Sequence, residues 1–166
     1  MNRIIKINNN DKGRTETMKA EDLRIGNYVR VSSDNCMFPK GALCEVVAID
    51  SERTHEEKKG LADLLQIVRE EWEFSHGVWC DDIEGIPINS EFLRKNGFEN
   101  VRHHIDEDGF EWCQYEHEDS CLEIWHYLQY DAYSAFYCAC ELCEISFVHE
   151  IQNIIAATKE SIKIIV

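Results

Sequence analysis

Three cysteines in the C-terminal half of the chain have the spacing of metal ligands. Cys138, Cys140 and Cys143 include one C-x-x-C pair, and thiolates at this spacing hold Zn²⁺ in structural sites. The second C-x-x-C pair that completes most such sites does not occur in the sequence. Two interpretations follow: a strand that directs small thiols into a core, or a three-cysteine zinc site completed by His117, His126 or His149.

Other cysteine chemistry is less well supported by the sequence. A thioredoxin-like pair stands at a helix N-terminus within a βαβ unit, whereas Cys140 and Cys143 follow a strand-like pattern. A Cys-His nucleophile is defined by geometry, and eight cysteines with seven histidines offer many accidental pairs. No phosphate-binding glycine loop, G-x-S-x-G or H-E-x-x-H motif occurs. The sequence therefore favours a non-enzymatic protein without a cofactor.

The C-terminal half of the chain is also strongly acidic. Residues 103–158 contain twelve Asp or Glu and no Lys or Arg, in a chain of net charge −15. Phosphate binding needs clustered basic residues, so direct nucleic-acid binding is not expected. Carboxylates beside aromatic rings suit a basic protein surface instead. The residues that we expect to contact it are Asp106, Glu107, Asp108, Glu111, Glu116, Glu118, Asp119, Trp125 and Tyr127.

The sequence gives no indication of a membrane partner. No apolar run approaches the roughly 20 residues of a spanning helix, and the first ten residues lack the apolar region of a secretory signal. We therefore expect a cytoplasmic protein with reduced thiols. The oligomeric state is left open.

The N-terminal part is expected to form a small β-barrel. Residues 1–17 are polar and aperiodic, which predicts a flexible extension, and Met18 is an alternative translation start. Residues 23–31 and 42–49 alternate apolar and polar positions, which predicts an antiparallel pair. Glycines 26 and 41 suit the corners of a bent SH3-like barrel over residues 18–88.

A helix is expected within this subdomain, near residues 55–70. Thr54 and Glu57 have the spacing of a capping box, and Leu61, Leu64 and Leu65 follow at helical spacing. A strand over residues 65–74 is the alternative.

Residues 89–166 are predicted to form a short helix, an antiparallel meander and a C-terminal helix. Asn89 is a natural N-cap and Gly97 a natural C-terminal stop. Period-two patterns over residues 101–105, 110–117, 121–128 and 133–140 predict four strands. The final helix is expected to start after Ser146 and to cover the meander, with a last strand over residues 162–166. The fold class is therefore α+β.

Three stretches of the sequence form a recognisable pattern. They are Met18–Val29 (MKAEDLRIGNYV), Asp82–Glu99 (DIEGIPINSEFLRKNGFE) and Val148–Asn153 (VHEIQN). In this order they resemble small uncharacterised proteins of Bacteroides-type gut bacteria and of their phages and prophages. The resemblance implies a phage or mobile-element accessory protein and assigns neither an activity nor a site.

Two functions are therefore expected. In the first, a non-enzymatic interaction protein covers a basic surface of a host protein, for example to inhibit a nucleic-acid-handling or defence protein. In the second, the alternative, the meander holds a small ligand or Zn²⁺ through Cys138, Cys140, Cys143 and His149, and an enzymatic role belongs to this alternative.

Overall fold

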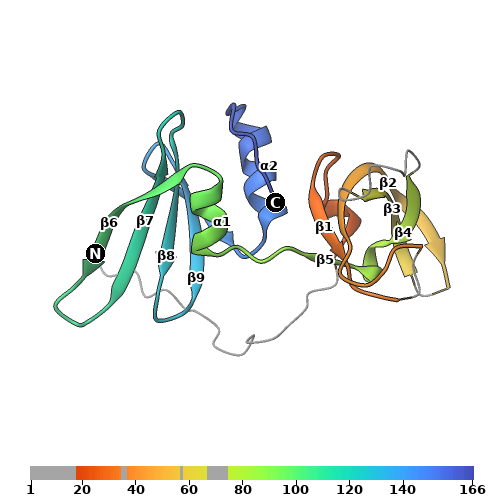
Figure 1. Cartoon of the computed structure of the whole chain (residues 1–166), viewed down its shortest axis with the longest axis horizontal. Coiled ribbons are helices and arrows are strands. Elements are labelled where there is room, and N and C mark those ends of the chain that lie inside the picture. Colours follow the sequence, from red (N-terminus) through yellow and green to blue (C-terminus); the bar gives the residue numbers. More distant parts are fainter. Residues whose placement is uncertain (1–17, 35–36, 57, 67–74) are drawn as a thin grey trace.

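Two five-stranded antiparallel sheets make up most of the fold (Figure 1). The computed structural model describes residues 18–34, 37–56, 58–66 and 75–166. The first sheet has the order β4-β3-β2-β1-β5 and the second the order β10-β9-β8-β7-β6. Two helices, α1 and α2, follow the first sheet in the chain, so the α+β class is confirmed.

The first sheet has its own core and confirms the predicted pairing of its first two strands. Val29 on β1 lies opposite Cys44 on β2, and both are fully buried. Among the described strands β4 and β5 do not pair with each other, so this sheet is open and a closed barrel is not shown. Its elements are η1 (Ala20–Asp22), β1 (Tyr28–Val31), β2 (Leu43–His55), β3 (Lys58–Gln66), β4 (His76–Trp79), η2 (Cys80–Asp82) and β5 (Ile83–Gly85).

The predicted helix over residues 55–70 is wrong, because β2 and β3 form one long hairpin there. Gly60, Ala62 and Leu64 are buried and alternate along β3, so its apolar residues fit period two as well as helical spacing. Gly60 argues against the helix, since its φ of 79° is unsuited to helical backbone. The position is also closely packed, because a Cβ there would lie 2.8 Å from Ala20 Cβ. The alternative strand over residues 65–74 falls mostly outside the described residues.

The second sheet is a meander of five strands, one more than predicted. Its strands are β6 (Phe98–Ile105), β7 (Glu111–His117), β8 (Leu122–Tyr127), β9 (Ala132–Tyr137) and β10 (Cys140–Ile145). The additional strand is β10, which pairs with β9 after a tight turn at Cys138 and Ala139. Both turn residues have positive φ, 49° and 62°, although neither is Gly or Asn. The usual sequence signal of such a hairpin is therefore missing.

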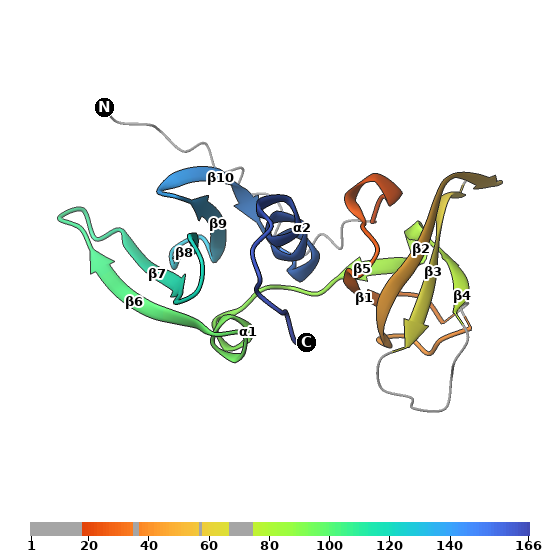
Figure 2. The ribbon, with the colours of Figure 1, turned by 90° about the horizontal axis from the view of Figure 1, so that it is seen from above.

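Helices α1 (Ser90–Lys95) and α2 (Val148–Thr158) lie on the same side of the second sheet (Figure 2). The predicted cap is confirmed, since Asn89 Oδ1 accepts a hydrogen bond from the Phe92 N–H at 2.8 Å. Helix α2 starts one residue later than predicted, after Phe147 rather than Ser146. No strand forms over residues 162–166, all of which are described. No helix in the described part of the chain is long and apolar enough to cross a membrane.

Helix α2 also contacts the first sheet and lies between the two sheets (Figure 1). Its Gln152 Oε1 accepts a hydrogen bond from the Tyr28 N–H at 2.9 Å, and Gln152 Nε2 donates to the Gly26 carbonyl at 2.9 Å. At the start of α2, the Val148 N–H donates to the carbonyl of Ile86, the residue after β5, at 2.8 Å. The three stretches that carry the sequence resemblance therefore meet at this junction.

Candidate functional site

One face of the second sheet is covered by neither α1 nor α2, the two α-helices of the described residues. Alternation along the strands directs Cys113, Tyr115, Leu122 and Ile124 into the core beneath α1 and α2. The side chains between them point to the opposite side, which we call the outer face. Its acidic, basic and aromatic members are Glu99, Arg102, His104, Trp112, Glu116, Glu123, Trp125, Tyr127, Phe136, Glu141 and Glu144.

Three glutamates form a row across neighbouring strands of the outer face. Glu99 on β6 lies directly opposite Glu116 on β7, which in turn lies opposite Glu123 on β8. We call these three residues the acidic row. Like charges in directly opposed positions destabilise a sheet. None of the ion pairs in the described part of the chain involves these carboxylates.

Neutral donors hold two carboxylates of the acidic row in place. Gln114 Nε2 donates to Glu116 Oε1 at 2.7 Å and to Glu123 Oε2 at 3.0 Å. Trp125 Nε1 also donates to Glu123 Oε2, at 3.2 Å. These bonds fix the oxygens without neutralising their charge, so the row keeps its attraction for cations.

An aromatic stack lies beside the acidic row. The Trp112 and Trp125 rings are parallel within 7° and their centroids are 4.5 Å apart, and the Trp125 and Phe136 centroids are 4.7 Å apart. We call these three residues the aromatic stack. Both faces of the Trp125 ring are covered, by Trp112 on one side and by Phe136 on the other, so the stack presents ring edges, along which the aliphatic stem of an arginine can pack.

A cavity of about 470 Å³ lies at the end of the outer face. Glu99 and Glu116 of the acidic row line it together with Glu118 and Asp119 from the β7–β8 turn. No Lys or Arg occurs among its described lining residues. The cavity therefore concentrates four carboxylates around a space large enough for a basic side chain.

The structure separates the nine predicted partner-binding residues into four groups. Glu116, Trp125 and Tyr127 lie on the outer face, and Glu118 and Asp119 lie at the adjoining cavity. Glu111 points to the opposite face, where His103 Nε2 contacts its Oε1 at 2.6 Å.

The remaining three predicted residues occupy the β6–β7 turn, at the far end of β7. Asp106 Oδ1 accepts hydrogen bonds there from the N–H groups of Asp108 and Phe110, at 3.0 and 2.8 Å. Asp106 therefore closes the turn, which is a structural role. Glu107 and Asp108 are exposed in this turn, away from the acidic row.

The predicted zinc ligands are not brought to one place. Cys143 and His149 line the same cavity beside α2, whereas Cys138 lies at the β9–β10 turn, where its N–H donates to the Cys121 carbonyl at 3.2 Å. Burial, with a smaller effect of Glu150, raises the pKa of the Cys143 thiol. No group of three His, Cys, Asp or Glu side chains suited to a metal ion occurs in the described residues. The zinc site stays a prediction that this geometry does not support.

Sequence reasoning missed several members of the outer face. Glu123 and Trp112 lie within the predicted strands over residues 121–128 and 110–117, where alternation puts Glu123 on the face of Trp125 and Trp112 on the face of Glu116. Glu141 and Glu144 lie on β10, the strand that was not predicted. Glu99 depends on the register of β6, which shifts between Asn100 and Arg102 and has no sequence signal.

Comparisons with protein-family models, with curated proteins and with solved structures gave no match to this chain.

Proposed function

We propose that this chain is an acidic, non-enzymatic interaction protein of phage or mobile-element type, which binds a basic surface of a host protein through its outer face. The observation that carries the proposal is the acidic row, in which three directly opposed carboxylates have no ion pair among the described residues. A cationic partner that lies across the row relieves the repulsion between them and forms ion pairs at the same time.

Arginine is the partner residue that fits this surface best. Its aliphatic stem can pack along the ring edges of the aromatic stack while its guanidinium N–H groups pair with Glu123, which is hydrogen-bonded to Trp125. A second basic side chain can enter the cavity between Glu116 and Glu118. The surface therefore suits a protein segment with several basic residues.

Inhibition of a nucleic-acid-handling protein follows from the same arrangement. Side chains on neighbouring strands are about 5 Å apart, so the acidic row holds carboxylates in a fixed line. A site built for successive phosphates presents basic residues in a comparable line. The acidic row can occupy such a site and compete with the nucleic acid.

The first sheet is proposed to be of SH3-like type. Its strand order β5-β1-β2-β3-β4, with the 3-10 turn η2 just before β5, is typical of SH3-like barrels.

The protein is proposed to be cytoplasmic. This location agrees with the free thiols of all seven described cysteines.

The test compares two double variants that remove equal charge. Glu99→Gln/Glu116→Gln alters the acidic row, and Glu107→Gln/Asp108→Asn alters the exposed β6–β7 turn as a matched control. Each protein is titrated with an arginine-rich peptide and is used to capture partners from host-cell lysate. We expect the row variant to bind the peptide about tenfold more weakly, equivalent to about 1.4 kcal/mol, and to lose a partner that the control retains.

The captured partner is then tested for nucleic-acid binding in the presence of the chain. Wild type and the turn variant should both inhibit that binding, whereas the row variant should not. Equal weakening by both double variants would mean that binding depends only on total charge, and the proposal would then be rejected.

A further inference from the structure

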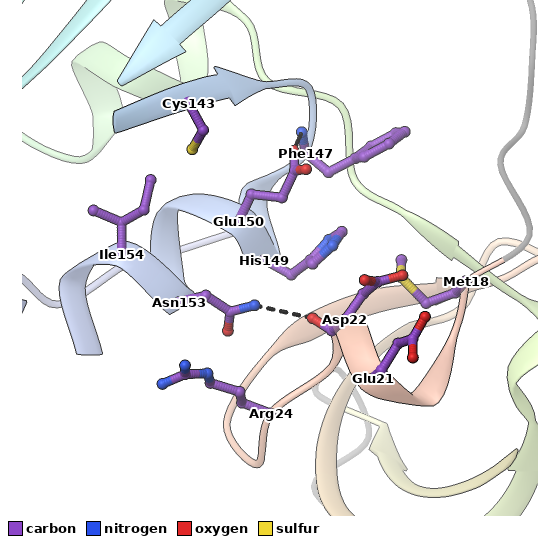
Figure 3. A pocket seen from close by; sticks show the side chains of 10 residues that line it. All are labelled: Met18, Glu21, Asp22, Arg24, Cys143, Phe147, His149, Glu150, Asn153 and Ile154. Atoms are coloured by element: carbon purple, nitrogen blue, oxygen red, sulfur yellow. Dashed lines mark hydrogen bonds between the residues drawn. The ribbon is translucent and has the colours of Figure 1, made fainter. Parts of the chain in front are cut away.

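A second cavity, separate from the outer face, lies between η1 and α2 (Figure 3). Its volume of about 400 Å³ is within the roughly 300–1,000 Å³ typical of small-molecule sites. Asn153 on α2 connects the two walls, because its Nδ2 donates to the Asp22 carbonyl at 2.9 Å. The two walls of the cavity are therefore held together by a hydrogen bond at the junction between the two sheets.

A buried histidine with one unpartnered ring nitrogen lines this cavity. His149 is 3% exposed, and its Nδ1, which is itself buried, has no hydrogen-bond partner among the described residues. Its ring packs against the Phe147 ring with centroids 5.8 Å apart and points from α2 towards the η1 side of the cavity (Figure 3). A buried polar group without a partner destabilises the fold, so a hydrogen bond from a ligand to this imidazole would be favourable.

The charge of the lining indicates the sign of the ligand. Glu21, Asp22 and Glu150 face one basic residue, Arg24, so the formal lining charge is three negative and one positive, a net of −2. Glu150 Oε2 accepts the N–H groups of Ser146 and Phe147, at 2.6 and 2.8 Å, which fixes the orientation of this carboxylate. Glu21 has an exposed contact with Lys19 at 3.7 Å. An anionic ligand is therefore disfavoured, and a cationic one is favoured.

The rest of the lining suits a cationic group that is attached to an aliphatic chain. Met18, Phe147 and Ile154 contribute apolar surface. The stacked rings of Phe147 and His149 add aromatic surface, against which a cationic nitrogen can pack. A neutral imidazole can also accept a hydrogen bond from such a nitrogen.

We propose that this cavity binds a primary ammonium or guanidinium group on an aliphatic chain, with His149 as hydrogen-bond acceptor and Asp22, Glu21 and Glu150 as counter-charges. The same group occurs in small polyamines and in lysine or arginine side chains of peptides. A bare metal ion fits less well, because the described carboxylates and His149 do not form a group suited to one. The site is independent of the outer face.

The test is a titration of the ¹⁵N-labelled full chain, followed by NMR. Agmatine and putrescine represent small amines, N-acetyl-arginine amide and N-acetyl-lysine amide represent peptide side chains, and butylurea is the uncharged control. The variants are Glu21→Gln/Asp22→Asn, which removes counter-charge, and His149→Phe, which keeps a buried aromatic ring. Glu107→Gln/Asp108→Asn serves as the charge-matched control, and thermal melts verify that each variant folds.

We expect saturable shifts of the Asp22, His149 and Asn153 signals with at least one amine or amide, and none with butylurea. The Glu21→Gln/Asp22→Asn variant should weaken the Kd about tenfold or more, and His149→Phe should weaken it in a protein that still melts cooperatively. The compound that binds shows whether the site takes a small amine or a lysine or arginine side chain of a peptide. Absence of saturation in all cationic arms, or equal Kd values in the cavity and control variants, would overturn the proposal.

Shifts that vanish in Glu99→Gln/Glu116→Gln would overturn it as well, because they would place the bound cation on the outer face. The two proposals therefore fail separately. Loss of peptide binding at the acidic row leaves the amine site intact, and the reverse also holds.

Discussion

The side chains of Asn27 and Asn153, which are 126 positions apart in the sequence, form a hydrogen bond across the junction of the two sheets. Asn27 Nδ2 donates to Asn153 Oδ1 at 3.1 Å, while Asn27 Oδ1 accepts from the Arg24 N–H at 2.7 Å. Asn27 is only 2% exposed. One buried amide therefore ties the loop before β1 to helix α2.

Replacement of Asn27 by Ala should lower the free energy of unfolding by about 1–3 kcal/mol, because it leaves buried partners without a hydrogen bond. Asn153→Ala should cost less, since Asn153 is partly exposed. In the double variant the two effects should be less than additive. Urea denaturation of the four proteins measures this coupling, and strict additivity would show that the bond does not stabilise the junction.

A second close contact at the junction involves a glycine. A Cβ added to Gly85 would lie 2.5 Å from two carbons of the Phe147 ring. Gly85→Ala should therefore destabilise the protein by about 1–3 kcal/mol. Phe147→Ala removes these two carbons and leaves only Phe147 Cβ, at 2.9 Å, so Gly85→Ala should cost less in that background. Thermal unfolding of the single and double variants checks this, and an equal cost in both backgrounds would contradict the contact.

The β9–β10 turn offers a stabilising substitution. Ala139 has a φ of 62°, and the left-handed region costs a non-glycine residue roughly 1–2 kcal/mol. Ala139→Gly should therefore raise the free energy of unfolding by up to about 1 kcal/mol. Ala135→Gly, in the buried middle of β9, is the control and should lower it. A melting temperature of Ala139→Gly below that of wild type would contradict the turn geometry.

Local signals in the sequence predicted local structure well. Asn89 and Gly97 bound α1 because capping depends on residues within one turn. The period-two patterns over residues 110–117 and 121–128 correctly predicted β7 and β8, because the side-chain period of a strand is two. Ser146 failed as a cap for a non-local reason: Phe147 forms a β-bridge with Pro87, which keeps the chain extended to the start of α2.

The candidate sites were harder to predict because they depend on register and on distant contacts. The acidic row exists only because β6, β7 and β8 pair in one register, and the β6 bulge that sets it leaves no pattern in the sequence. The cavity beside His149 needs η1 and α2, which are more than 120 residues apart, to meet. Cys143 and His149 both line this cavity, but two of the three acids around them, Glu21 and Asp22, come from the N-terminal part of the chain.

His149 should make stability depend on pH. Burial lowers the pKa of this histidine below its ordinary value of 6.5, although Glu150 and Asp22 act in the opposite direction. As the pH falls below about 6.5, the unfolded chain therefore binds a proton that the folded state resists, and the free energy of unfolding falls. This loss ends once the pH has passed through the lowered pKa of the folded state.

The variants His149→Phe and Asp22→Asn separate this effect from other titrations. His149→Phe should show a flatter dependence than wild type below pH 6.5, because the group that resists protonation is gone. Asp22→Asn should extend the loss to lower pH, because removal of a nearby carboxylate lowers the pKa of His149 further. Urea denaturation at a series of pH values gives the stabilities, and NMR titration of the imidazole gives the pKa. A folded-state pKa at or above 6.5, or an unchanged slope in His149→Phe, would show that His149 is not the group responsible.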